Sequence, residues 1–209
     1  PRAKPSRLTC EDLLTGHIAW SSELAAGSIA TVLDADTLGV VDPRGLITLD
    51  VGCSTGGFTD CLLQRGAERV YAVDVGYGLI DWKLRQDPRV VLLERTNIRY
   101  IDRSRISEPI DLAVIDVSFI SLTVVLPSVV PLLRHEGRVV ALVKPQFEVG
   151  KGQVGAGGIV RDEAQRRAVT EKVISSGAAL GLAATAVLDS PVKGKKGNRE
   201  ILVGFQYQG

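Results

Sequence analysis

Residues 46–66 read LITLDVGCSTGGFTDCLLQRG: an apolar run, then a turn rich in glycine, then a stretch that suits a helix. This order predicts a strand at 46–51 and a helix at 57–65, joined by a tight turn. Glycines permit such a turn and let a ligand approach the backbone closely. The segment therefore predicts the start of a βαβ unit with a cofactor bound at its turn.

The alternation of short strands and helices continues toward the C-terminus. Further strands are predicted at 69–74, 90–94, 111–117, 137–143, 183–190 and 200–206, and further helices at 79–86, 120–134 and 161–180. The link SPVKGKKGNRE between the last two strands is too short for a helical crossover, so these strands must pair antiparallel. The expected fold class is α/β: a doubly wound, seven-stranded, mainly parallel, Rossmann-like sheet with a C-terminal antiparallel hairpin. This is the usual architecture of S-adenosylmethionine methyltransferases.

Length and composition indicate one ordinary globular domain. At 209 residues the chain can form one substantial core, and we expect a helical N-terminal extension at 1–45 followed by a methyltransferase domain at 46–209. No apolar run approaches the roughly 20 residues that cross a bilayer, and no secretory signal is apparent, so we expect a cytoplasmic protein without a membrane partner. Three cysteines without a CxxC pair predict neither a disulfide framework nor a metal site.

The glycine-rich turn favours one class of cofactor. Asp50, at the end of the first strand, would repel a diphosphate but suits the cationic amino acid end of S-adenosylmethionine. In the dehydrogenase fingerprint G-x-G-x-x-G the middle glycine is replaced here by Ser54. Asp74 is placed to accept the ribose hydroxyls of an adenosine ligand, and Asn97 lies near its adenine amine. The predicted cofactor-binding residues are Asp50, Gly52, Ser54, Thr55, Gly56, Gly57, Phe58, Asp74, Val75, Asn97 and Asp116.

Three ionisable residues are predicted at the same edge of the sheet. Asp116 ends the fourth strand, Lys144 ends the fifth, and Glu200 begins the last, which runs the opposite way. Ligands of open α/β sheets bind at this edge, so the three should converge beside the cofactor. A ribose 2′-hydroxyl is a poor nucleophile, and a lysine made less basic by its surroundings can accept its proton. We expect Lys144 to be the base or the hydroxyl-orienting group, with Asp116 and Glu200 orienting it.

A cluster of cations lies next to Glu200. The net charge is only +1, so nucleic-acid binding must rest on local patches, and residues 193–199 read KGKKGNR. Such clusters favour phosphate contacts, and Lys151, among glycines, belongs to a predicted mobile lid over the substrate. The predicted RNA-binding residues are Lys151, Lys193, Lys195, Lys196 and Arg199.

Six segments together resemble the TlyA group, which is related to the FtsJ ribose methyltransferases. They are DVGCSTGGFTD (50–60), VDVGYG (73–78), WKLRQDPRV (82–90), ERTNIR (94–99), SFISL (118–122) and VKPQFEVGKGQVG (143–155). The resemblance runs from about residue 45 to the C-terminus. It implies 2′-O-methylation of cytidine in ribosomal RNA by a lysine–aspartate–lysine–glutamate tetrad, with the ribosomal RNA or a ribosomal subunit as partner. Asp116, Lys144 and Glu200 match the last three tetrad members.

The chain departs from this group in two respects. The usual N-terminal S4-type RNA-binding domain is not found, and no lysine occurs between Arg7 and Lys83 to match the first tetrad member, which leaves Lys4 as the upstream candidate. The departures keep open a cofactor-binding protein that grips RNA or a ribosome without methylating it. A nicotinamide oxidoreductase is a third reading, disfavoured by Asp50, Ser54 and the terminal hairpin. Members of the group have also been labelled haemolysins, but nothing in the sequence indicates membrane activity.

Overall fold

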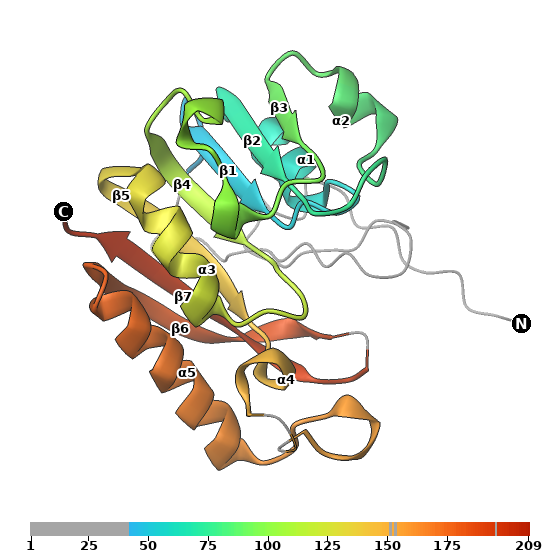
Figure 1. Ribbon diagram of the computed structural model, residues 1–209, viewed down its shortest axis with the longest axis vertical. Coiled ribbons are helices and arrows are strands. Elements are labelled where there is room, and N and C mark those ends of the chain that lie inside the picture. The colour runs from blue at the N-terminus through green and yellow to red at the C-terminus, as the bar shows by residue number, and fades with distance from the viewer. Residues whose placement is uncertain (1–41, 151, 153, 195) are drawn as a thin grey trace, which may run out of the picture.

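The computed structural model describes residues 42–209 except Lys151, Gln153 and Lys195, and it contains a seven-stranded sheet with the order β3-β2-β1-β4-β5-β7-β6 (Figure 1). The strands are β1 (Ile47–Val51), β2 (Arg69–Val73), β3 (Val90–Leu93), β4 (Ile110–Ile115), β5 (Leu133–Val143), β6 (Leu182–Lys193) and β7 (Arg199–Tyr207). Strands β1 to β5 pair in parallel, and β7 pairs antiparallel with both β5 and β6. The predicted fold class is confirmed, including the antiparallel hairpin.

Helices cover both faces of the sheet. The α-helices are α1 (Gly57–Gln64), α2 (Trp82–Gln86), α3 (Leu122–Val129), α4 (Pro145–Glu148) and α5 (Glu163–Ala178), and short 3₁₀ helices are η2 (Ile98–Tyr100), η3 (Arg103–Arg105), η4 (Val130–Leu132) and η5 (Ala156–Gly158). Buried side chains of α3 and α5 belong to one apolar cluster, and those of α1 and α2 belong to a second. Side chains of a strand alternate between faces, so both clusters draw on the same strands.

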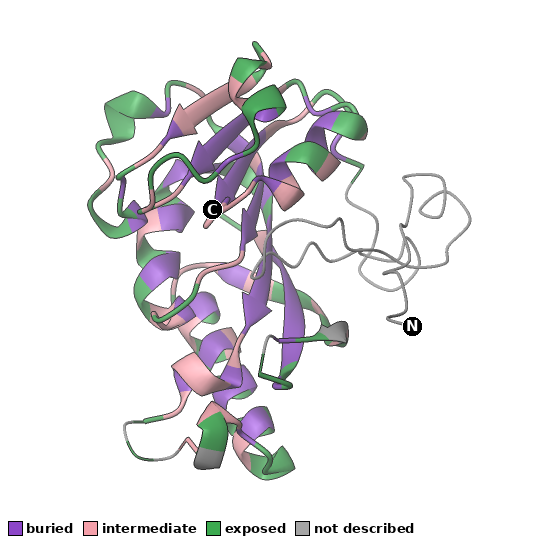
Figure 2. Cartoon of the chain, turned by 90° about the vertical axis from the view of Figure 1, so that its right-hand side faces the viewer, coloured by how far each residue is buried: buried purple, intermediate pink, exposed green. Residues whose placement is uncertain are grey.

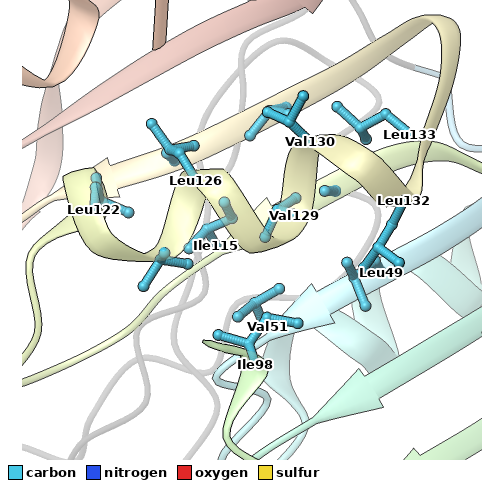
Figure 3. Close-up of a cluster of buried hydrophobic side chains, with 14 of the residues drawn as sticks. Leu49, Val51, Ile98, Ile115, Leu122, Leu126, Val129, Val130, Leu132 and Leu133 are labelled. Carbon is cyan, nitrogen blue, oxygen red and sulfur yellow. The ribbon is translucent and has the colours of Figure 1, made fainter. Parts of the chain in front are cut away.

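The larger cluster lies between α3 and the central strands. Leu122, Leu126 and Val129 of α3 face Leu49 of β1 and Ile115 of β4 (Figure 3). Figure 2 shows the central strands as the most continuously buried part of the molecule. This packing fixes where the carboxyl ends of β1 and β4 lie, and the site is built at those ends.

Two helices and two strands differ from the predicted bounds by three residues or more, among them β6, which was predicted to end at residue 190 and ends at Lys193. The helix predicted at 79–86 begins at Trp82 because the Asp81 side chain caps it, accepting a hydrogen bond from the Lys83 backbone N–H at 2.8 Å. The helix predicted at 120–134 ends at Val129, with Pro131 in the short η4 that follows. Strand β5 begins at Leu133, four residues before the predicted start, and its pairing with β4 shifts register near that end.

The predicted helical extension at residues 1–45 lies mostly outside the residues that the structure describes. Residues 1–41 of the predicted helical extension lie outside the described residues, and residues 42–45 form a turn that leads into β1. Among the residues that the structure describes, none of the helices has the length and apolar character needed to cross a membrane.

Candidate active site

A cavity of about 530 Å³ opens at the carboxyl edge of the sheet, within the usual size range of small-ligand pockets. Its wall comes from the ends of β1, β2, β4 and β5 and from the turn before η2. The lining residues are Val51, Gly52, Cys53, Ser54, Gly57, Phe58, Val73, Asp74, Val75, Leu79, Thr96, Asn97, Ile98, Arg99, Asp116, Val117, Ser118, Phe119, Ile120, Val125 and Lys144. Most of the predicted cofactor-binding residues are therefore brought together, with Asp50, Thr55 and Gly56 as exceptions.

The glycine-rich turn is as tight as the sequence predicts. Gly52 has φ +87°, and a Cβ there would lie 2.3 Å from the backbone oxygen of Asp116. Gly56 has φ +98° and begins α1, and a Cβ there would lie 2.3 Å from Cδ1 of Leu84. Both positions favour glycine because of their positive φ, and at Gly52 the backbone of Asp116 also leaves no room for a Cβ. Gly56 therefore shapes the turn without lining the cavity.

Asp74 is held at the rim of the cavity by two backbone groups. Its Oδ2 accepts a hydrogen bond from the Ser54 N–H at 2.8 Å, and its Oδ1 accepts one from the Gly76 N–H at 2.7 Å. Each carboxylate oxygen accepts more than one hydrogen bond, so the held carboxylate can still accept ribose hydroxyls. The geometry suits the role that the sequence assigns to Asp74.

Asn97 lines the cavity, and its Oδ1 already accepts a hydrogen bond from the Arg99 N–H at 3.1 Å, capping η2. Its neighbours Thr96, Ile98 and Arg99 also line the cavity, although the sequence reasoning did not select them. Their position directly after β3, at the same edge of the sheet, is the feature of the sequence that could have predicted them as cavity residues. Buried Ile98 adds the apolar surface that an adenine ring requires.

Asp50 does not line the cavity but lies fully buried beneath the glycine-rich turn. It faces α1, where the Thr59 hydroxyl donates to its Oδ2 at 2.6 Å, and its Oδ1 has no partner among the described residues. Burial raises the pKa of Asp50 to about 7, nearby Asp116 and Asp74 raise it further, and the Thr59 hydrogen bond opposes them. Asp50 supports the turn from behind, and its predicted contact with a ligand stays a prediction that its place outside the cavity lining does not favour.

Asp116 and Lys144 form a nearly buried ion pair on the cavity wall. Lys144 Nζ lies 2.5 Å from Asp116 Oδ1, and the two side chains are 11% and 12% exposed. Lys144 Nζ also donates to the Ser118 hydroxyl at 3.2 Å. Burial raises the pKa of Asp116, and the charge of Lys144 opposes this rise. The structure thus brings together the two residues that were predicted to meet here.

Glu200 lies next to this ion pair but not on the cavity wall. It is 2% exposed, at the start of β7, and its Oε1 accepts a hydrogen bond from Gln146 Nε2 at 3.1 Å. Burial raises the pKa of Glu200; the charge of Lys144 and the Gln146 hydrogen bond oppose the rise, and Asp116 adds to it. Glu200 is therefore close enough to feel the charges of both members of the pair, and its role in orienting Lys144 stays a prediction.

The basic link between β6 and β7 is attached to the segment that follows α4. Asn198, only 2% exposed, accepts a hydrogen bond from the Val160 N–H at 2.9 Å and donates one to the Gly158 carbonyl at 2.9 Å. Lys193, Lys196 and Arg199 are exposed, whereas Lys151 and Lys195 lie outside the described residues. Asn198 was not selected from the sequence, because its role depends on contacts between distant segments.

Phe119 is a further feature that the sequence reasoning missed. Its ring is 89% exposed beside the cavity, and its centroid lies 4.9 Å from that of Phe147. The backbone at Phe119 has φ +63°, a conformation uncommon for a bulky residue. An exposed ring at this position offers a stacking surface for a nucleobase.

Known proteins of one family are similar in sequence to this chain. The FtsJ-like methyltransferase family matches residues 32–207. The 16S/23S rRNA (cytidine-2′-O)-methyltransferase TlyA of Mycobacterium tuberculosis is 46% identical over 190 residues, which are 91% of this chain and 69% of that protein.

Solved structures show the same fold. A protein from Streptococcus thermophilus that carries the name hemolysin has a TM-score of 0.78 at 44% identity, over 80% of this chain and 61% of that one. The N-methyltransferase NodS from Bradyrhizobium japonicum, in complex with S-adenosyl-l-homocysteine, has a TM-score of 0.58 at 17% identity, over 79% of this chain and 80% of that one. The second likeness concerns the fold alone.

Proposed function

Because this chain belongs to the FtsJ-like methyltransferase family, we propose that it transfers a methyl group from S-adenosylmethionine to the ribose 2′-hydroxyl of a cytidine in ribosomal RNA. The observation that carries the proposal is the Lys144–Asp116 ion pair on the wall of the cavity beside the glycine-rich turn. The position of this pair suits a reaction in which a hydroxyl must be activated next to a bound methyl donor.

The residues of the cavity fit S-adenosylmethionine. The volume is adequate, Asp74 offers a held carboxylate for ribose hydroxyls, and Ile98 and Val75 offer apolar walls. When bound there, this cofactor supplies an electrophilic methyl group. Gly52 would allow the cofactor to lie close to the backbone, next to Asp116.

Lys144 is the proposed base or hydroxyl-orienting group. To act as the base, Lys144 would have to meet the hydroxyl as a neutral amine, whose lone pair takes the proton. As the hydroxyl-orienting group it is an ammonium with three N–H donors, and Asp116 and Ser118 account for two partners in the described part of the chain. The remaining direction suits the 2′ oxygen of a ribose that enters the cavity. Holding that oxygen in line with the methyl group supplies much of the acceleration expected for such a transfer.

The test is Lys144→Ala in a tritiated-methyl assay on total ribosomal RNA. We expect methyl transfer to fall by about a thousandfold or more, which is the order of magnitude for loss of a positioned acid–base group together with its orienting effect. Calorimetry with S-adenosylmethionine should give an unchanged affinity. Lys83→Ala, at an exposed lysine of α2, is the matched control and should behave as wild type. Substantial turnover by Lys144→Ala would refute the assignment.

A second candidate is a protein that binds S-adenosylmethionine and RNA without transferring the methyl group. The sequence supports it because no lysine stands between Arg7 and Lys83, where the first member of the tetrad is expected. The same tritium assay on the wild-type chain separates the two candidates, since the second predicts cofactor binding with no incorporated label.

The proposed partner is ribosomal RNA, free or within a ribosomal subunit, and the proposed location is the cytoplasm. The exposed cations in and beside the β6–β7 link, Lys193, Lys196 and Arg199, support RNA contact because they lie close to Glu200 in the sequence. The exposed ring of Phe119, which follows β4 and lines the cavity, also supports RNA contact.

A further inference from the structure

Gln146 forms a hydrogen bond with Glu200, one of the proposed catalytic residues. The sequence alone does not reveal this contact. It lies in α4, two residues after Lys144, and its Nε2 donates to Glu200 Oε1 at 3.1 Å. The opposite orientation of the amide would place two acceptor oxygens together, so the hydrogen-bonding pattern supports this assignment. The contact joins the end of β5 to the start of β7.

The β6–β7 link approaches the same oxygen of the Glu200 carboxylate, Oε1. A Cβ built at Gly194 would lie 2.4 Å from Glu200 Oε1 and 3.0 Å from its Cδ, so a side chain at this position would push the carboxylate out of its place. The Gly194 N–H is itself held by the Asn198 carbonyl at 2.8 Å. Glu200 is therefore fixed between the amide of Gln146 and the backbone of the β6–β7 link.

We propose that Gln146 is a positioning residue, which keeps the buried Glu200 carboxylate ionised and directed toward Lys144. Gln146 is the hydrogen-bond donor that the described residues give to this carboxylate, and Glu200 Oε2 has no partner among them. A buried carboxylate without a donor tends to take up a proton, because burial disfavours its charged form. A neutral Glu200 would no longer attract the Lys144 ammonium, which would keep its contacts with Asp116 and Ser118.

The electrostatic surroundings of Glu200 give the direction of the effect. Burial raises its pKa, Lys144 on β5 and the amide of Gln146 lower it, and Asp116 at the end of β4 raises it. Loss of the amide therefore raises the pKa further. If ionised Glu200 is the active form, activity is lost as the pH falls through the pKa of Glu200. In a variant without the amide this loss should begin at a higher pH than in wild type.

The experiment is the pH profile of kcat for Gln146→Met, which keeps the size of the side chain and removes the donor. With saturating S-adenosylmethionine and ribosomal RNA, we expect the acid limb to move upward by about one pH unit, with kcat approaching the wild-type value at high pH. KM for both substrates should stay within about twofold. A purely structural role would instead lower kcat at every pH.

Gln64→Met is the matched control, because Gln64 Nε2 also donates to a carboxylate, Asp60 Oδ2 at 2.7 Å, but on the exposed surface of α1. Its profile should overlie that of wild type. An unshifted limb in Gln146→Met, or a uniform loss of kcat, would overturn the inference. Should that variant fail to fold, Gln146→Glu gives the same test, since two adjacent carboxylates share a proton and move the limb in the same direction.

The inference rests on the proposed role of Glu200, and Glu200→Gln separates the two failures. If Glu200→Gln keeps wild-type kcat, the proposed role of Glu200 fails, and the inference about Gln146 fails with it. If Glu200→Gln is inactive while Gln146→Met has an unshifted profile, the proposed function stands and only the inference about Gln146 is wrong.

Discussion

At the scale of single residues, the buried acids decide how the site responds to pH. Asp50, Asp116 and Glu200 all lie in or beside the site, and burial raises the pKa of each. Lys144 is the cation that the structure places among them. A cationic methyl donor would add a further positive charge near these acids, which favours their ionised forms.

Asp50 gives a measurable consequence for stability. The pKa of Asp50 is about 7 in the folded chain, whereas its ordinary value, which applies to the unfolded chain, is 3.8. Between these two pH values the folded chain therefore holds a proton that the unfolded chain has released. The free energy of unfolding therefore falls as the pH rises through this window, by on the order of 4 kcal/mol, and levels off above it. In Asp50→Asn this contribution is absent. Urea unfolding at pH 4.5 and pH 8 should show Asp50→Asn gaining stability relative to wild type at the higher pH, and a constant difference would contradict the buried-acid account.

The sequence predicted the three charged residues of the site because strand ends share one edge of a parallel sheet. Gln146 and Phe119 could not be predicted in the same way, although they stand close to Lys144 and Asp116 in the chain. Their contacts depend on the conformation of the backbone after the strand ends, which the sequence pattern does not specify. Asp50 was expected to touch the ligand, but strand alternation directs it toward α1.

At the scale of elements, the β6–β7 hairpin forms part of the site as well as the edge of the sheet. Its link is held to residues 158–160 by both side-chain groups of Asn198. The short link predicted antiparallel pairing, but nothing in its sequence distinguished Asn198 from an ordinary turn residue. The helix predicted at 120–134 was too long because its apolar run begins before the Ser121 cap and continues through Pro131, which lies beyond the end of α3.

Asn198→Ala should release the segment at residues 158–160 from this link. The Val160 N–H, which donates to the Asn198 side chain, should exchange with solvent about fivefold faster or more, since a buried hydrogen bond contributes about 1 kcal/mol or more. The Gly194 N–H is an internal control, because it donates to the Asn198 backbone carbonyl, which alanine retains. Equal protection of Val160 in both proteins would show that the side chain does not hold the segment.

At the scale of the whole molecule, charge is nearly balanced and RNA binding must be local. The formal net charge is +1, so long-range attraction contributes little. Alternation and link length predicted the sheet and its hairpin. The strand order β3-β2-β1-β4-β5-β7-β6 was not predicted, because the sequence pattern does not say which strands become neighbours.

Replacing Lys193, Lys195 and Lys196 together by Ala should weaken RNA binding and flatten its dependence on salt. Each lost phosphate contact with a single strand lowers the slope of log affinity against log salt by about 0.7. Filter binding across a salt series measures this slope, and calorimetry should show unchanged affinity for S-adenosylmethionine. Lys83→Ala, at an exposed lysine of α2, is the control. An unaltered slope in the triple variant would place the RNA elsewhere.

The close approach of Gly52 to the backbone of Asp116 has a consequence for anyone who wishes to redesign the protein. The two loops touch without a side chain between them, so neither can be remodelled while the other stays in place. Enlarging the turn to admit bulkier donor analogues would displace the acid that pairs with Lys144. Room for such analogues is better sought on the far wall, at Ile98, where a smaller side chain widens the cavity and leaves that acid where it is.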